Sequence, residues 1–144
     1  MDDLFELRIT ALKIKKLYDM KCTEIMEKYE IRRADVDILW MIYRSGNDKT
    51  ARAIAATGMS KANISKSIEN LRSNNLISLE PDISDRRYMH IHLKTDAYDI
   101  IDEIAKIKTK INNDLFAGIS AEEKEIFKRI RNQLEHNINI QYSF

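Results

Sequence analysis

The 144-residue sequence is poor in cysteine, proline and glycine, of which it has one, one and three. The single Cys22 excludes an intrachain disulfide framework and fits a reducing compartment. No apolar run approaches the ~20 residues that a membrane span needs, and the acidic start Met1-Asp2-Asp3 is unlike a signal peptide, so we expect a cytoplasmic protein without a membrane partner. A low content of helix-breaking glycine and proline, together with 33% charged residues, is typical of one compact, mainly helical chain.

Motifs of catalysis are absent as well. The sequence has no glycine-rich phosphate loop, no nucleophile elbow and no HExxH helix, so we expect neither enzymatic activity nor a cofactor. His90 and His92 share one face of a predicted strand and could chelate a metal, but zinc sites normally need three or four protein ligands, and no third is visible. We interpret both as surface residues that lie near phosphate.

Apolar residues recur at three- and four-residue intervals, which predicts amphipathic helices over about residues 4–27, 34–44, 51–56 and 61–73. Two more helices follow. The first of them has its apolar face on Ile100, Ile104, Ile107, Ile111 and Leu115. The last opens with the capping box Ser120-Ala-Glu-Glu123 and continues to Ile138.

Residues 50–94 have the layout of a winged helix-turn-helix. Two short predicted helices meet at Gly58, and two strands of alternating polarity, residues 76–79 and 88–93, flank the polar segment PDISDRR. Residues 49–94 hold eight basic and four acidic residues, a net charge of +4 in a chain whose formal net charge is +1. Positive charge gathered on one module suits a phosphate-binding face, so the pattern predicts double-stranded DNA as the partner. An ordinary solvated surface is the alternative.

The predicted helix 61–73 has two unlike faces. Ile64, Ile68 and Leu71 form its buried stripe, and Ser60 is the expected N-cap. The opposite face is short or cationic and rich in hydrogen-bonding groups: Lys61, Ala62, Asn63, Ser65 and Lys66. A helix that served only solubility would more often carry Glu/Lys pairs, so we interpret this face as one that contacts a polar, anionic partner.

The terminal helices carry more apolar surface than a small winged module can cover, and burial between two copies would remove it from water. A symmetric homodimer would place two recognition helices in successive major grooves, roughly 34 Å apart. The expected organisation is an N-terminal dimerisation helix (1–32), a winged helix-turn-helix module (33–95) and C-terminal dimerisation helices (96–144).

With these features, roughly residues 31–136 resemble the MarR (multiple antibiotic resistance regulator) family of winged helix-turn-helix transcription factors. The resemblance is carried by Gly58-Met-Ser-Lys-Ala-Asn-Ile-Ser, by Asn74-Asn-Leu-Ile, and by the wing motif Asp82-Ile-Ser-Asp-Arg-Arg87 that leads to His92-Leu-Lys-Thr. Arg32 departs from the family pattern, because Thr or Ser is common in this N-cap region.

The resemblance implies a homodimer that binds pseudo-palindromic operators, with the recognition helix in the major groove and the wing in the flanking minor groove. It implies DNA contacts from Ser60, Lys61, Ala62, Asn63, Ser65 and Lys66. Lys61 and Lys66 suit phosphate, whereas Asn63 and the serines can read base edges. In the wing, Arg87 is the expected minor-groove residue, and Asp85 and Arg86 are expected to form a stiffening ion pair, unless the two arginines exchange roles.

Two further hypotheses concern a ligand and a redox sensor. Some relatives bind aromatic carboxylates between the dimer helices and the winged module, where Tyr18, Trp40 and Tyr43 are candidate pocket residues; plain core packing is the alternative. Cys22 shares a helical face with tyrosines, as in relatives that sense peroxide; the alternative is a small apolar residue that fills the core.

These observations together predict a mainly α fold with a small β-hairpin wing. They predict a homodimeric, DNA-binding transcriptional regulator, most often a repressor in this family, that a small aromatic ligand would release from its operator. The rival hypothesis is a helical dimerisation or adaptor protein that has lost DNA binding.

Overall fold

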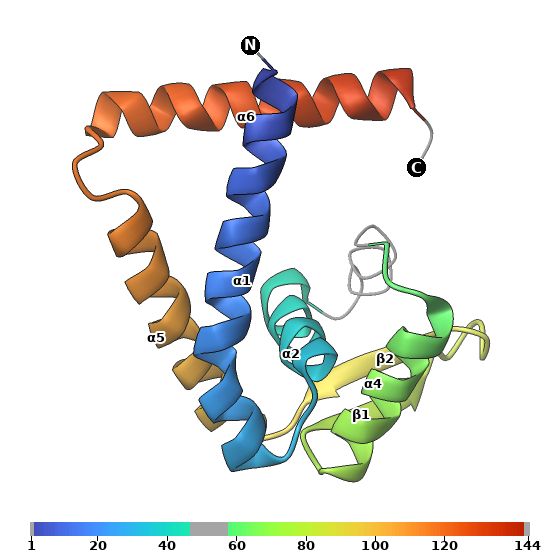
Figure 1. Cartoon of the computed structure of the whole chain (residues 1–144). Coiled ribbons are helices and arrows are strands. Elements are labelled where there is room, and N and C mark those ends of the chain that lie inside the picture. Colours follow the sequence, from blue (N-terminus) through green and yellow to red (C-terminus); the bar gives the residue numbers. More distant parts are fainter. Residues whose placement is uncertain (1, 47–57, 143–144) are drawn as a thin grey trace. The chain divides into compact units, whose positions relative to one another are not determined.

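The computed structural model describes residues 2–46 and 58–142, and the expected helix at residues 51–56 lies outside these ranges. The chain divides into two compact units, residues 1–108 and 109–144. The described residues form five helices and one two-stranded sheet (Figure 1), which confirms the mainly α fold with a hairpin wing. None of these helices is long and apolar enough to cross a membrane. The functional division at residues 32 and 95 stays a prediction.

Helix α1 (Asp3–Tyr29) begins where the Asp2 side chain accepts a hydrogen bond from Phe5 N, 3.0 Å away. It ends at Glu30, which takes the left-handed conformation with φ 53°. Only its second half contributes to the core, through Cys22 and Ile25. In the first half of the helix, Ile14 is 39% exposed.

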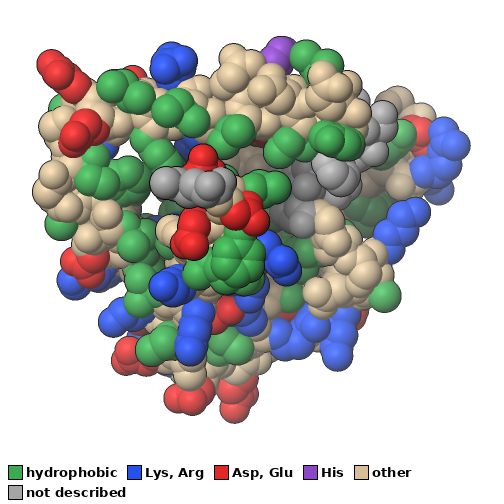
Figure 2. Space-filling view, turned by 45° about the horizontal axis from the view of Figure 1, so that its top comes forward, with side chains coloured by type: hydrophobic (Ala, Val, Ile, Leu, Met, Phe, Trp, Pro, Cys, Tyr) green, Lys and Arg blue, Asp and Glu red, His purple; other side chains and the backbone are tan. Residues whose placement is uncertain are grey.

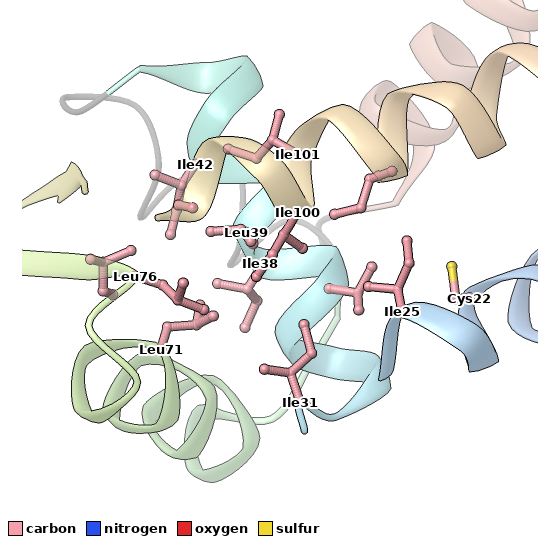
Figure 3. Close-up of a cluster of buried hydrophobic side chains, with 14 of the residues drawn as sticks. Cys22, Ile25, Ile31, Ile38, Leu39, Ile42, Leu71, Leu76, Ile100 and Ile101 are labelled. Carbon is pink, nitrogen blue, oxygen red and sulfur yellow. The ribbon is translucent and has the colours of Figure 1, made fainter. Parts of the chain in front are cut away.

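The core of the first unit lies between α1, α2 (Arg33–Ser45) and the first turns of α5 (Ala97–Leu115). Its fully buried side chains are mostly β-branched or leucine, and Figure 3 shows them converging from these helices and from α4: Ile38, Leu39, Ile42, Leu71, Ile100 and Ile101. At the surface of the same unit, Lys28 Nζ lies 2.8 Å from Glu103 Oε1 and ties α1 to α5.

Helix α4 (Lys61–Ser73) has the bounds that the sequence predicts. A tight turn follows it, in which Asn75 has φ 60° and Leu76 N donates to Leu71 O over 2.9 Å. The antiparallel strands β1 (Ile77–Pro81) and β2 (Met89–Leu93) come next, with Ile77 opposite Leu93 and Leu79 opposite Ile91. Ile77 and Ile91 point into the core, so the hairpin is fixed to the helices by one face and leaves its tip in solvent.

The second unit contains α6 (Ala121–Gln141). The predicted capping box is confirmed, because Glu123 N donates to Ser120 Oγ (3.1 Å) and Ser120 N donates to Glu123 Oε2 (2.8 Å). Five apolar side chains of α6 are about half exposed: Ile126, Phe127, Ile130, Leu134 and Ile138.

Candidate nucleic-acid interface

The outer face of α4 is exposed over its first two turns. Ser60 is the N-cap, and its Oγ accepts a hydrogen bond from Asn63 N, 3.1 Å away. Four of the residues that the sequence assigns to this face are open to solvent: Lys61, Ala62, Ser65 and Lys66. Asn63 differs from them, since it is half-buried at the edge that faces α2. On the inner side, Leu71 and Ser67 are fully buried, while Ile64 and Ile68 are only partly covered.

Arg32, at the start of α2, explains the burial of Asn63. One guanidinium nitrogen of Arg32, NH1, donates to Asn63 Oδ1 over 3.1 Å, and the other, NH2, donates to Ser67 Oγ over 2.7 Å. NH2 also lies 3.2 Å from Asp35 Oδ1, and the Asp35 side chain is only 1% exposed. Arg32 therefore connects the first two turns of α4 to α2, and the buried carboxylate of Asp35 holds Arg32 in place.

From the sequence, Arg32 was only an unusual residue for an N-cap, and its hydrogen bonds with Asn63, Ser67 and Asp35 were not predicted. An arginine side chain has no hydrogen-bond acceptor, so it cannot cap the helix as Ser or Thr would. Asp35, the third residue of the helix, makes the reciprocal bond instead, because its Oδ2 accepts a hydrogen bond from Arg32 N over 2.9 Å. The spacing of Arg32 and Asp35, three residues apart, was the signal in the sequence that an ion pair forms here.

The tip of the wing is ordered by one carboxylate. Asp82 Oδ2 accepts hydrogen bonds from Ser84 N (2.9 Å), Ser84 Oγ (2.6 Å) and Asp85 N (2.9 Å). Its other oxygen, Oδ1, lies 2.7 Å from His90 Nε2 on β2. The Ser84 hydroxyl, followed by His90 and the two backbone groups, holds the pKa of Asp82 well below its usual range. Asp82 therefore stays ionised and fixes how the chain turns towards the two arginines.

Asp85 forms an ion pair with Arg87 and not with the expected Arg86, while the choice of the arginine that enters the minor groove stays a prediction. Arg87 Nε lies 3.0 Å from Asp85 Oδ1, and Arg87 NH2 lies 2.9 Å from Asp85 Oδ2. The hydrogen bonds from Arg87 lower the pKa of Asp85. The Arg87 side chain is still 87% exposed. Arg86 is exposed and makes no hydrogen bond or ion pair within the described ranges.

The wing thus ends in two guanidinium groups, one held by a fork of two hydrogen bonds and one without such a restraint. Figure 2 shows Lys and Arg side chains at the right-hand edge, the side on which Figure 1 places the wing, and others over the lower part of the same view. The two histidines face carboxylates across the hairpin, since His92 Nε2 lies 3.1 Å from Glu80 Oε2 and His90 contacts Asp82.

Of the three aromatic residues proposed for a ligand pocket, Tyr18 and Trp40 lie close to cations, and Tyr43 lies beside Trp40. The Trp40 and Tyr43 rings are 5.5 Å apart, and Tyr43 is 46% exposed. Tyr18 is half-buried, and its ring lies 4.5 Å from Arg33 Cζ and 4.4 Å from Lys108 Nζ. Lys108 Nζ also lies 5.1 Å from the Trp40 ring. The structure therefore surrounds aromatic faces with positive charge, which the sequence did not reveal because Lys108 is remote along the chain.

Burial changes the acid–base properties of this aromatic cluster. It raises the pKa of the Tyr18 phenol, with Cys22 as the second cause, and the Tyr18 hydroxyl is buried without a hydrogen-bond partner among the described residues. Burial also lowers the pKa of Lys108. Arg33 is held by two carboxylates, Asp19 Oδ1 at 2.9 Å and Asp37 Oδ1 at 2.8 Å.

Cys22 is fully buried, and burial raises the pKa of its thiol. A redox-sensing cysteine needs a lowered pKa and access to solvent. Cys22 has neither property in this structure, so its geometry matches the alternative of a small side chain that fills the core. The redox hypothesis itself stays a prediction that only chemical modification can test.

Comparison with known proteins finds similarity to winged helix-turn-helix regulators. Residues 29–87 match the sequence profile of the MarR family. The crystal structure of MarR itself is similar to this chain, with 20% identity, a TM-score of 0.75 and coverage of 98% of this chain and 97% of that one. BpsR of Bordetella bronchiseptica, whose DNA binding is regulated by 6-hydroxynicotinic acid, has 17% identity, a TM-score of 0.73 and coverage of 94% of each chain. A regulator from Methanosarcina mazei Go1 has 15% identity, a TM-score of 0.75 and coverage of 98% and 94%.

Proposed function

We propose that the chain is a transcriptional regulator of the MarR family, whose profile residues 29–87 match, and that it is a homodimeric repressor that binds a pseudo-palindromic DNA operator. The observation that carries the proposal is the exposed outer face of α4, which lies in the same compact unit as the arginine-tipped wing. In this proposal α4 enters the major groove, and the wing reaches the adjacent minor groove.

The chemistry of the two surfaces supports separate tasks. Lys61 and Lys66 are flexible, exposed cations that suit phosphate oxygens and so set the position of the helix. Ser60, Asn63 and Ser65 carry groups that can bond to base edges. A guanidinium is planar and always charged, so Arg86 and Arg87 suit the strongly negative potential of a narrow minor groove.

The proposed dimer is supported by exposed apolar surface on the helices outside the winged module. The first turns of α1 leave Leu4 77% and Phe5 51% exposed, and Leu7 and Leu12 are about half exposed. On α6, Ile130 and Leu134 are 46% and 47% exposed. Apolar stripes of this kind mark interaction surfaces, and we propose a second copy of the chain as the occupant.

Salt titration distinguishes this proposal from an adaptor protein that has lost DNA binding. Each phosphate that a cation neutralises contributes about −0.9 to the slope of log affinity against log salt concentration. If Lys61 and Lys66 of both copies reach phosphate, we expect a slope at least as steep as about −3.5, measured by fluorescence anisotropy with an operator duplex. The double variant Lys61→Gln, Lys66→Gln should have a slope shallower by about that amount.

A dimeric protein that binds no duplex at low salt would favour the adaptor hypothesis. Sedimentation velocity on the same samples reports the oligomeric state, and a monomer at micromolar concentration would contradict the proposed dimer.

We further propose that a small aromatic carboxylate binds near Tyr18 and releases the operator. The support is the pair of cations against aromatic rings, Arg33 and Lys108 around Tyr18, together with the known regulation of BpsR by 6-hydroxynicotinic acid. A ligand that binds only the folded state at 100 times its Kd adds about 2.7 kcal/mol of stability. We therefore expect at least one hydroxybenzoic acid to raise Tm by several degrees in a thermal-shift series.

The variant Lys108→Met keeps most of the aliphatic stem and removes the charge, so it should lose most of this stabilisation. A flat response of the wild-type protein across the whole acid series would contradict the effector proposal and leave the DNA-binding proposal standing.

A further inference from the structure

We propose that Arg32 fixes the orientation of the Asn63 amide and thereby makes Asn63 read guanine in preference to adenine. The inference rests on the proposed DNA binding by α4, and it assigns a specificity-determining role to a residue that itself lies on α2. The side-chain oxygen of Asn63 has a defined hydrogen-bond partner in the structure, so the base preference of Asn63 can be argued from geometry.

The orientation of the amide follows from the chemistry of its partner. A guanidinium has only donors, so the Asn63 atom 3.1 Å from Arg32 NH1 must be the carbonyl oxygen Oδ1. The reverse orientation would place the amide NH₂ group against another donor. Asn63 Oδ1 is therefore turned towards α2, and the two Nδ2 hydrogens remain to meet a partner outside the protein.

The guanidinium of Arg32 is itself held firmly. Its NH2 group donates to Ser67 Oγ and lies beside the buried carboxylate of Asp35. The other oxygen of Asp35 accepts hydrogen bonds from Arg32 N at 2.9 Å and from Asn70 Nδ2 at 3.5 Å. Because Asp35 is 1% exposed, this anion cannot easily exchange its partners for water, and Arg32 keeps one position.

The fixed hydrogen bond from Arg32 to Asn63 Oδ1 changes which base Asn63 can bind. Asn reads adenine with two bonds, one donated to N7 and one accepted from the N6 amino group. In this structure an adenine amino group would share Oδ1 with Arg32 and would bring its hydrogen next to a positive charge. Guanine presents two neighbouring acceptors, N7 and O6, and no donor on that edge. The donors of Asn63, with the part-exposed guanidinium of Arg32 behind them, match this pattern.

The test is selection of bound sequences from random duplexes, with quantitative readout of each base at each position. The wild-type protein and Asn63→Ala are compared first, because the position at which Asn63→Ala loses base preference is the position that Asn63 reads. At this position we expect wild-type protein to favour guanine over adenine by about tenfold, in line with the discrimination of one good side-chain contact. Adenine preference at this position would overturn the inference without any change to Arg32.

Two further variants test the role of Arg32. Arg32→Lys keeps a positive charge near Asp35 but has no fork with which to hold a second group, so the preference for guanine over adenine should fall to within about threefold. Arg72→Lys is the matched control, since it makes the same exchange at an arginine of α4 that binds Glu69 and does not contact Asn63 in the structure; its base preference should equal that of wild type. An unchanged preference in Arg32→Lys would also overturn the inference.

Failure of the underlying proposal gives a different result. If wild-type protein enriches no sequence at any salt concentration, the proposed DNA binding is wrong, and this inference falls with it. If an operator is enriched and its Asn63-dependent position prefers adenine, only the role of Arg32 is wrong.

Discussion

Alanine in place of Arg87 is expected to weaken operator binding by at least about tenfold, which corresponds to ~1.4 kcal/mol. Two effects act in the same direction. The variant loses a guanidinium that is 87% exposed at the tip of the wing, and it releases the Asp85 carboxylate that Arg87 binds through two hydrogen bonds. An unpaired anion at the wing tip would then face the DNA, where like charges repel.

Fluorescence anisotropy with an operator duplex measures this loss, and sedimentation should show an intact dimer. Arg72→Ala is the matched control, because Arg72 also binds a carboxylate, that of Glu69, but from the C-terminal turn of α4. We expect this control to stay within about threefold of wild type, as for a single peripheral phosphate contact. Wild-type affinity in Arg87→Ala, combined with a large loss in Arg86→Ala, would assign the minor-groove contact to Arg86.

The largest effect on stability is expected from Asp35→Ala, which should lower the free energy of unfolding by about 3 kcal/mol or more. The variant leaves Arg32 without its buried counter-charge and leaves Arg32 N without its acceptor at the first turn of α2. Removal of one member of a buried ion pair is costly for this reason, even where the intact pair contributes little net stability. Urea unfolding at matched protein concentration measures the change.

Asp37→Ala is the control for this prediction. Asp37 lies two residues further along the same helix and pairs with Arg33, but its side chain is 45% exposed. An exposed pair contributes roughly 1 kcal/mol or less. If the two variants lost equal stability, the buried ion pair of Asp35 with Arg32 would not stabilise the fold more than the exposed pair of Asp37 with Arg33 does.

Local signals were enough to predict most of the elements. Ser60 and the short polar residues after it mark the start of α4, and the structure begins the helix at Lys61 as expected. The capping box of Ser120 and Glu123 likewise identified the start of α6. The first strand begins one residue later than predicted. Leu76 is apolar like a strand residue, but its N–H is used to close α4 through Leu71 O.

Contacts between distant side chains could not be predicted in this way. Asn63 and Ser67 both lie on α4, but their contacts with Arg32 span 31 and 35 residues and exist only once α2 and α4 are packed together. Whether Asp85 pairs with Arg86 or with Arg87 depends on the conformation of the turn at the tip of the wing. Both neighbouring arginines fit the sequence pattern, and the hydrogen bonds of Asp82 to Ser84 and Asp85 decide how the turn presents them.

Arg32 and Arg33 are joined by one peptide bond at the start of α2, yet they reach different neighbours. Arg32 holds Asn63 on α4, whereas Arg33 holds Asp19 on α1 and lies against the Tyr18 ring. A small molecule that competed with Asp19 for Arg33 would therefore act one residue away from the group that steers the Asn63 amide. The start of α2 is thus the place at which the proposed ligand site and the proposed base contact lie one residue apart along the chain.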